Sequence, residues 1–389
     1  KMGGGLMQLV AYGAQDIYLT GNPQITFFKV VYRRHTNFSM EAIEQTLNGS
    51  TGYGNKVSAT VSRNGDLVGR MYVEYTQATA DTANCANPGT ALLDEITCEI
   101  GGQQIDKHYG HSMEVMAQLE EENPTASNPT NATVAVNSSE ATSWTRFQKM
   151  SGSGGVLGDT TTSMGKIFVP LRFWFCKNAG LALPLIALQY HEVKLSIKFQ
   201  TQTLCKGAAF GTVALWADYI YLDTDERRRF AQVSHEYLIE QLQFQSQSTS
   251  TSHDLNFNHP VKELIWTGVP AAAGAAAGPS TPSTVSTGST YKVTLNGHDR
   301  FVARDYRYFT RAQVWQHHTG AGSVNVVDSI AVYSFALKPE EHQPSGTCNF
   351  SRIDNAQLKL TTTQALNIYA VNYNVLRIMS GMGGLAYSN

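Results

Sequence analysis

Two histidines and an aspartate lie close together in the sequence and could form a metal site. His108 and His111 are three positions apart, so they would share one face of a helix, and Asp106 lies just before them. Imidazole nitrogens and carboxylate oxygens bind zinc, but a structural zinc site needs four such ligands. No further ligand stands at a recognised spacing, and the ligand pattern of a cupin enzyme is missing. We therefore predict no metal ion and no other cofactor.

Motifs that would indicate catalysis or phosphate binding are also missing. The glycine-rich stretch 152–158 fits neither the dinucleotide-binding pattern nor the P-loop pattern. No G-x-S-x-G segment is present, and Ser, His and Asp show no triad-like arrangement. The five cysteines contain no C-x-x-C pair, which favours buried free thiols in a reducing compartment. The chain is therefore predicted to have no catalytic residues and not to be an enzyme.

One compact basic run, Arg227–Arg229, could contact DNA. Three acidic residues within 223–226 come directly before it. Acidic residues before basic ones match the dipole of a short helix, which favours a solvated or interface-paired helix. The formal net charge of −2 also provides no strong field for a polyanion. Direct binding of nucleic acid is therefore not predicted.

Five N-x-[ST] sequons could accept a glycan. They are Asn37, Asn48, Asn131, Asn137 and Asn349. Asn131 and Asn137 lie in a polar stretch that has room for a sugar, whereas the other three stand beside strand-like sequence. Asn131 and Asn137 are therefore the candidate glycosylation sites.

The composition indicates a large core and a surface poor in charge. Of the 389 residues, 42% are hydrophobic and 15% are charged, against roughly 25% charged in a typical soluble domain. A chain of this size usually needs more than one core, which favours two domains. The longest apolar stretch, 181–188, contains Pro184 and is too short to span a membrane. A surface with so little charge suits a protein that is largely covered in an assembly.

Alternating polar and apolar residues predict strands in both halves of the chain. Lys56–Ser62 and Leu67–Tyr75 flank a turn signal and are predicted to pair as a hairpin. Further strands are predicted at His191–Phe199, Tyr237–Phe244, Ser329–Leu337 and Tyr369–Met379. Helical periodicity is convincing only at Gly110–Glu121 and Asp223–Gln232. Many short strands with polar turns are typical of sandwiches of the jelly-roll type.

The domain boundary is placed near Tyr221–Arg229, between the two strand-rich halves. We predict an N-terminal arm at 1–24, a first jelly roll at 25–222, a connector at 223–236 and a second jelly roll at 237–389. Glu121–Asp159 and Thr267–Thr290 are rich in small and polar residues and are predicted to be long loops, one in each half.

Several long segments resemble the major capsid proteins of nucleocytoplasmic large DNA viruses, especially those of algal viruses. The segments are Gly5–Phe38, Ile100–Gly110, Asp225–Glu240, Tyr333–Asn355 and Asn374–Asn389. The resemblance implies an all-β double jelly roll, with two eight-stranded antiparallel sandwiches and short connector helices. It further implies a homotrimer that forms a pseudo-hexagonal capsomer of an icosahedral capsid.

The same resemblance implies where the protein acts and with what. The expected location is the virion capsid, assembled in the host cytoplasm. The expected partners are the other copies of the trimer, neighbouring capsomers and minor capsid proteins, and an inner membrane beneath the shell is also allowed. Closed threefold contacts would prevent open-ended filaments.

The predicted arm carries more apolar surface than an idle tail would. Leu6, Leu9, Tyr12, Ile17 and Tyr18 are its main apolar residues. Glycines and Pro23 make the segment a poor jelly-roll strand. We predict that it lies beneath the sandwiches and contacts neighbouring subunits or minor proteins.

A carbohydrate-binding or receptor-binding β-sandwich is the alternative. Such a module would act as a monomer and would group exposed aromatic residues on its loops to stack on sugars. The five tryptophans are instead spread singly, mostly in apolar, strand-like sequence: Trp144, Trp174, Trp216, Trp266 and Trp315.

Overall fold

The chain divides into two units, Lys1–Asn37 and Phe38–Asn389. A computed structural model describes residues 7, 10–11, 13–20, 22–24, 33–76, 88–121, 150, 166–202, 209–270, 282–320, 322 and 328–387. The smaller unit includes the short helix α2 (Ile17–Thr20), and the Thr20 hydroxyl donates to the Asp16 carbonyl at 2.7 Å. No helix among the described residues is long and apolar enough to cross a membrane.

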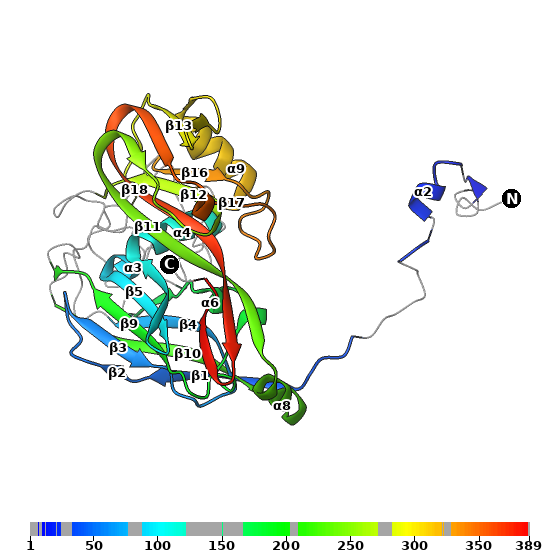
Figure 1. Cartoon of the computed structure of the whole chain (residues 1–389). Helices are drawn as coiled ribbons and strands as arrows, with labels where there is room; N and C mark the ends of the chain where they lie inside the picture. Colours follow the sequence, from blue (N-terminus) through cyan, green and yellow to red (C-terminus); the bar gives the residue numbers. More distant parts are fainter. Residues whose placement is uncertain are drawn as a thin grey trace, which may run out of the picture. The chain divides into compact units, whose positions relative to one another are not determined.

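The first half of the larger unit is a sandwich of two antiparallel sheets (Figure 1). One sheet has the order β1-β10-β4-β7, with β8 paired to β4, and the other has the order β2-β3-β9-β5-β6. The first sheet comprises β1 (Phe38–Gln45), β10 (Thr212–Leu222), β4 (Leu67–Thr76), β7 (Lys166–Pro170) and β8 (Leu183–Pro184). The second comprises β2 (Leu47–Asn48), β3 (Lys56–Thr60), β9 (Val193–Phe199), β5 (Leu93–Ile100) and β6 (Gln103–Tyr109). Their facing apolar side chains form one core.

The predicted hairpin is wrong, although both of its strands exist. Strand β3 pairs with β2 and β9, whereas β4 pairs with β10, β7 and β8 in the opposite sheet. The connection between them is held by β10: the Tyr219 hydroxyl donates to the Ser62 carbonyl at 2.6 Å, and the Asp66 carboxylate accepts from the Leu222 amide at 2.8 Å. Alternation of side chains predicts a strand but does not identify its partner.

The second half forms a sandwich in which two long strands pass through both layers. Strand β11 (His235–Asp254) and β18 (Ala356–Met379) pair along most of their length, with irregularities between Gln247 and Ser252. The other strands are β12 (Pro260–Gly268), β13 (Thr290–Leu295), β14 (His298–Asp299), β15 (Arg304–Asp305), β16 (Ile330–Ser334), β17 (Cys348–Asn349) and β19 (Met382–Leu385). Because β11 and β18 belong to both layers, these nine described strands form one continuous sheet.

Short helices connect the strands, and two of them confirm the sequence prediction. They are α4 (Gly110–Glu120) and α8 (Thr224–Gln232), and the Asp223 side chain accepts from the Thr224 amide at the start of α8. The others that the structure describes in full are α3 (Pro88–Leu92), α6 (Trp174–Lys177), η2 (Ala179–Leu181), η3 (Tyr308–Ala312), α9 (Gln313–His317) and η4 (Phe350–Arg352). Helix α8 has no buried residue, whereas α4 is buried along most of its length.

The two predicted long loops are described only in part. All of 122–159 except Met150 lies outside the described residues, as does 271–281. The described end of the second loop is folded back on the sandwich, since Gly268 pairs with Ser283 and Val285 is buried. The described residues between the end of β12 at Gly268 and the start of β13 at Thr290 form no further helix or strand, in agreement with the predicted loop.

Candidate functional site

Helix α4 of the first sandwich packs on the sheet of the second and joins the two halves (Figure 1). Its residues Val115, Met116 and Leu119 form one apolar cluster with side chains of β12, β16 and β18, including Ile265 and Tyr369. Burying one such side chain contributes roughly 1.5–3 kcal/mol. We call this contact between the two sandwiches the seam.

The first end of α4 packs tightly within its own sandwich, and the second end bonds to the other sandwich. Gly110 begins the helix, and a Cβ there would lie 2.1 Å from the Leu93 carbonyl oxygen, so no larger residue fits. At the other end, the amides of Gly320 and Gly322 donate to the carbonyls of Leu119 (2.7 Å) and Gln118 (3.1 Å). Carbonyls in the last turn of a helix lack partners within it. Here the second sandwich supplies those partners.

Two of the three residues considered above for a metal site, Asp106 and His111, contact the second sandwich instead. Asp106 accepts from the Leu242 amide at 3.1 Å and contacts His108 Nε2 at 2.8 Å. His111 Nδ1 lies 2.5 Å from the Tyr369 hydroxyl, and burial lowers the pKa of His111 to about 3, which keeps the ring neutral. In the described ranges no group of three or more His, Cys, Asp or Glu residues could hold a metal ion.

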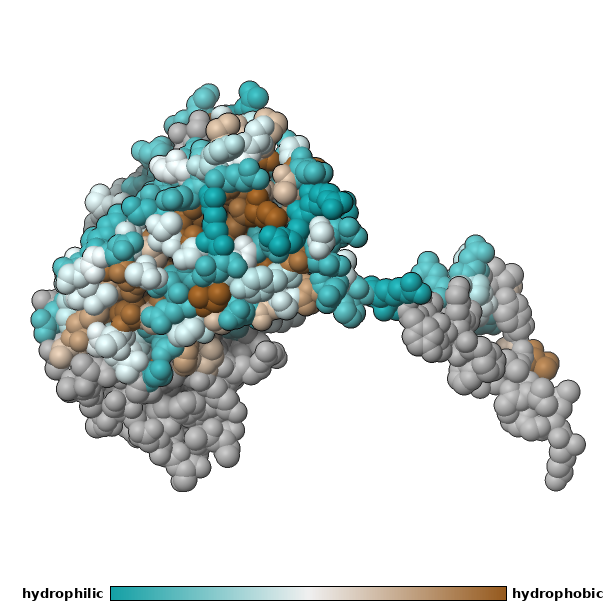
Figure 2. All heavy atoms as spheres, turned by 90° about the horizontal axis from the view of Figure 1, so that it is seen from below, coloured by the Kyte–Doolittle hydropathy of each residue, from teal (hydrophilic) through white to brown (hydrophobic). Residues whose placement is uncertain are grey.

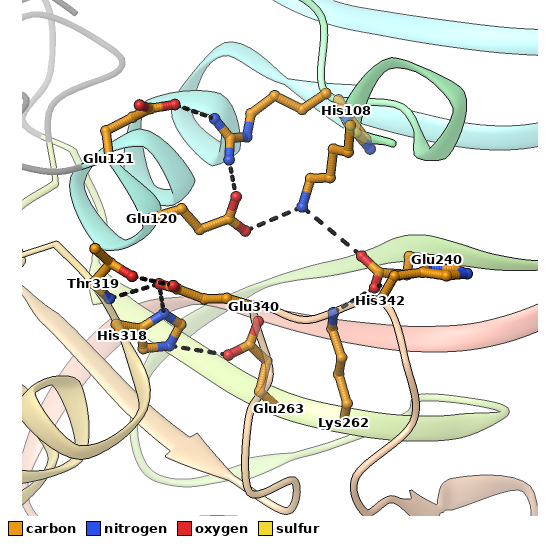
Figure 3. A network of polar contacts seen from close by, with 12 residues as sticks. His108, Glu120, Glu121, Glu240, Lys262, Glu263, His318, Thr319, Glu340 and His342 are labelled. Carbon is orange, nitrogen blue, oxygen red and sulfur yellow. Dashed lines mark hydrogen bonds and ion pairs between the residues drawn. The ribbon is translucent and has the colours of Figure 1, made fainter. Parts of the chain in front are cut away.

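Charged side chains line the seam beside α4 (Figure 3). Glu120 pairs with Arg172 and with Lys177 (3.1 Å), and Lys177 also lies 3.8 Å from Glu240 on β11. Buried Lys262 contacts Glu240 at 2.7 Å. Burial alone would raise the pKa of Glu120, but the cations of Arg172 and Lys177 lower it to about 2. Ion pairs therefore connect the first sandwich to the second.

A second charged cluster lies in the second sandwich. The His318 side chain is fully buried and lies 3.1 Å from Glu263 and 3.1 Å from Glu340. Glu340 also accepts from the Thr319 amide at 2.8 Å. Burial alone would lower the pKa of His318, but the negative charges of Glu263 and Glu340 raise it to about 9. His318 is therefore positively charged at neutral pH.

Protonation of His318 should make the free energy of unfolding depend on pH. Because the pKa of His318 is higher in the folded than in the unfolded chain, its charge stabilises the folded state fully below about pH 6.5. This stabilisation is lost as the pH rises toward 9. We expect a decrease of roughly 3 kcal/mol across this interval, since one pKa unit corresponds to about 1.4 kcal/mol. Urea denaturation at several pH values and fixed protein concentration measures it. The variant H318L should show a flatter profile, and an equally steep one would assign the effect to another group.

Family models cover almost the entire larger unit. The model for the "Major capsid protein N-terminus" matches residues 26–223, and the model for the "Large eukaryotic DNA virus major capsid protein" matches residues 226–384. The chain belongs to the major capsid proteins of large eukaryotic DNA viruses. This confirms the resemblance seen in the sequence.

Relatives of this major capsid protein align along its full length. The major capsid protein of Pyramimonas orientalis virus is 52% identical over 420 residues, and that of Paramecium bursaria Chlorella virus 1 is 44% identical over 461 residues. Both alignments cover 100% of each chain. The protein is accordingly a structural component of the virion capsid and not an enzyme.

Solved structures identify the fold as a double jelly roll. A quasi-atomic model of the capsid of Paramecium bursaria Chlorella virus 1 matches with a TM-score of 0.74 and 40% identity, covering 94% of this chain and 100% of that chain. The Faustovirus major capsid protein has a TM-score of 0.68 at 13% identity, covering 95% and 94%, and supports the fold alone. The predicted fold class is therefore confirmed.

Most of the other candidate residues of this major capsid protein lie outside the part of the chain that the structure describes. Asn131, Asn137, Leu6, Leu9 and Tyr12 lie outside the described residues. Ile17 belongs to α2, but only its backbone is described. The side chain of Tyr18, in the same helix, is exposed.

The larger unit contains the basic run and, at described positions, Trp174, Trp216, Trp266 and Trp315. Arg227 forms an ion pair with Asp66 at 3.0 Å, and α8 buries no residue, in agreement with the solvated helix that the sequence favoured. Trp174 and Trp266 are buried in cores, so they are not available to stack on a sugar.

The charged residues of the seam were not predicted from the sequence. Lys177 and Glu240 come from different sandwiches, as do Gln118 and Gly322. One local signal was present: Lys262 and Glu263 interrupt a strand that is otherwise apolar, and both are buried. Charged residues in a buried strand need partners, which indicates an ion-pair network but does not identify its members.

Proposed function

We propose that three copies of this major capsid protein form a trimeric, pseudo-hexagonal capsomer of an icosahedral shell. The seam carries this proposal: apolar packing, ion pairs and helix-end hydrogen bonds join the two sandwiches of one chain. Three such pairs supply six similar bodies, and a closed ring of identical contacts ends without forming a filament. The proposed domains remain 1–24, 25–222, 223–236 and 237–389, and the limits of the two family models support the central boundary.

Light scattering coupled to size exclusion tests the trimer. We expect a mass three times that of the 42.6 kDa chain, persisting on dilution, because a stable interface of this class buries more than about 2,000 Å². Negative-stain images should show pseudo-hexagonal particles. A species of single-chain mass under mild conditions would contradict the proposal.

The N-terminal arm, with Leu6, Leu9, Tyr12, Ile17 and Tyr18, is proposed to contact neighbouring subunits or minor capsid proteins beneath the shell. Exposed apolar side chains support this, since Met7, Val10 and Tyr18 are 62%, 63% and 90% exposed. Apolar residues left in water in one molecule are commonly covered in an assembly.

Deleting residues 1–20 should leave the unfolding transition of the two jelly rolls unchanged but reduce incorporation into shells several-fold. Urea denaturation and sedimentation of assembled particles measure the two effects. Full-length protein with Tyr18→Ser provides a milder comparison. Equal assembly by the truncated and full-length proteins would show that the arm has no such role.

The protein assembles with itself and neighbouring capsomers in the shell, and further partners are proposed. We infer contacts with minor capsid proteins, no direct contact with nucleic acid, and compatibility with a membrane beneath the shell. The net charge of −2 supports the second point. Assembly in the host cytoplasm is supported by Cys98 and Cys176, which are buried free thiols. Glycans are proposed at Asn131 and Asn137.

A further inference from the structure

The two sandwiches of the chain repeat one arrangement of strands and helices. The sheet β1-β10-β4-β7 of the first corresponds to the order β11-β18-β12-β16 of the second. In each sandwich, a helical segment directly precedes the strand that ends this order, β7 or β16, among the described elements. That segment is α4 in the first sandwich and η3 followed by α9 in the second. Equivalent surfaces of the two sandwiches can therefore be compared.

In the second sandwich, α4 covers the outer face of this sheet over β12 and β18. Ile265, Tyr369 and Val371 are 0%, 1% and 5% exposed, because Met116 and Leu119 of α4 pack on them. The apolar residues on this face are therefore interface residues rather than surface residues.

In the first sandwich, the equivalent outer face carries aromatic side chains that remain partly exposed, beside the charged pair Lys166–Glu74 at 2.5 Å. Tyr72, Phe168 and Trp216 are neighbours there, with ring centroids 5.8 Å apart for Tyr72–Phe168 and 6.5 Å for Tyr72–Trp216. Met40, on the neighbouring strand β1, is 56% exposed. The buried indole N–H of Trp216 has no partner within the described ranges. We call Tyr72, Phe168 and Trp216 the aromatic face.

The other sheet of the same sandwich shows what a solvent face looks like in this protein. Its outer side carries charged pairs, Lys107–Glu95 at 2.5 Å and Lys198–Asp94 at 2.6 Å. An antiparallel sheet that faces water normally has such polar residues outward. Figure 2 shows hydrophobic areas among hydrophilic ones on the side of the larger unit that is seen from below. The first sheet carries one such pair, Lys166–Glu74, but at the centre of its outer side it presents the three aromatic rings of the aromatic face.

The helical segment of the second sandwich has the pattern needed to cover it. In α4, Met113 enters the core of its own sandwich, and Met116 and Leu119 follow three and six positions later on the neighbouring sheet. In η3 and α9, Phe309 enters its own core, and Trp315 follows six positions later. Leu119 is fully buried, whereas Trp315 is 83% exposed. Trp315 therefore occupies the equivalent position but lacks its sheet.

We infer that Trp315 of one copy packs on the aromatic face of the next copy, as Leu119 packs on the second sandwich within the chain. The partner that covers the aromatic face is a second copy of the chain, because the chain itself carries both surfaces of such a contact. Within the chain only α4 and the second sandwich are paired in this way, which leaves Trp315 and the aromatic face for the contact between copies. Repeated three times, the contact closes a ring of six sandwiches in which internal and intermolecular seams alternate. This inference rests on the proposed trimer and specifies the surface that makes it.

Photo-crosslinking tests the contact directly. A benzophenone amino acid replaces Trp315, and isotopically light and heavy chains are mixed before assembly and irradiation. We expect light-to-heavy crosslinks from position 315 to peptides within 67–76, 166–170 or 212–222. The same probe at exposed Lys194, on the outer side of the polar sheet, should give none of these products. Crosslinks from position 315 that fall elsewhere, or that join residues of a single chain, would overturn the inference.

Substitution of Trp315 separates this inference from the trimer itself. Trp315→Glu should raise the dissociation constant of the trimer roughly 30-fold or more, as expected for a tryptophan at the centre of an interface, whereas Trp315→Phe should have a smaller effect. The free energy of unfolding of the separated chain should not change, because the side chain is exposed. If the wild-type protein is a trimer and Trp315→Glu leaves its dissociation constant unchanged, the contact is rejected but the trimer is not. A monomeric wild-type protein would reject both.

Discussion

Replacing His318 with leucine is expected to destabilise the protein by about 3–5 kcal/mol at pH 7, because it leaves a buried carboxylate without its cation. Glu263 is 1% exposed at its side chain and lies 3.1 Å from His318. Glu340 loses the same partner but is less buried. Urea denaturation at fixed protein concentration measures the change, since the stability of an oligomer depends on concentration.

Two further variants make the cause of this loss specific. Glu263→Gln in the H318L background removes the uncompensated charge and should restore a large part of the stability. His298→Leu, at an exposed position, should change the free energy of unfolding by about 0.5 kcal/mol or less. Failure of the double variant to recover would mean that packing around His318, rather than charge, produces the effect.

Replacing Trp266 with alanine should cost about 3–5 kcal/mol, as is typical for a large aromatic residue removed from a core. Trp266 is fully buried, and its ring centroid lies 5.2 Å from that of Phe309 and 5.7 Å from that of Tyr291. The cavity would lie between the two layers of the second sandwich. The yield of assembled trimers should decrease with the free energy of unfolding, measured by size exclusion and urea denaturation.

The matched variant Trp266→Phe separates volume from hydrogen bonding. The indole N–H of Trp266 has no partner among the residues that the structure describes, and burying such a donor costs about 1–3 kcal/mol. Phenylalanine removes that donor and keeps most of the ring, so we expect less than half of the loss caused by alanine. An equal loss in both variants would indicate that the indole makes a hydrogen bond to a group outside the described ranges.

Much of the fold could be predicted because its signals are local. Alternating side chains predicted the strands of both sandwiches, and the acidic start of α8 reflects the capping of that helix by Asp223. Helix α4 was also predicted, but its packing between the two sandwiches was not. A short segment with helical periodicity could equally be a surface connector. Its burial on both sides depends on sheets formed by residues far from it in the sequence.

The seam and the aromatic face were decided only by tertiary structure. Trp266 and Trp315 both follow apolar neighbours in the sequence, yet one is fully buried and the other is 83% exposed. The pairing of β3 with β9 rather than β4, and of Lys177 with Glu240, joins segments that no local pattern connects. Local sequence sets the periodicity of a strand or helix through its neighbouring residues. Which surface then covers it depends on contacts between distant segments, and for Trp315, as we propose, on a second copy of the chain.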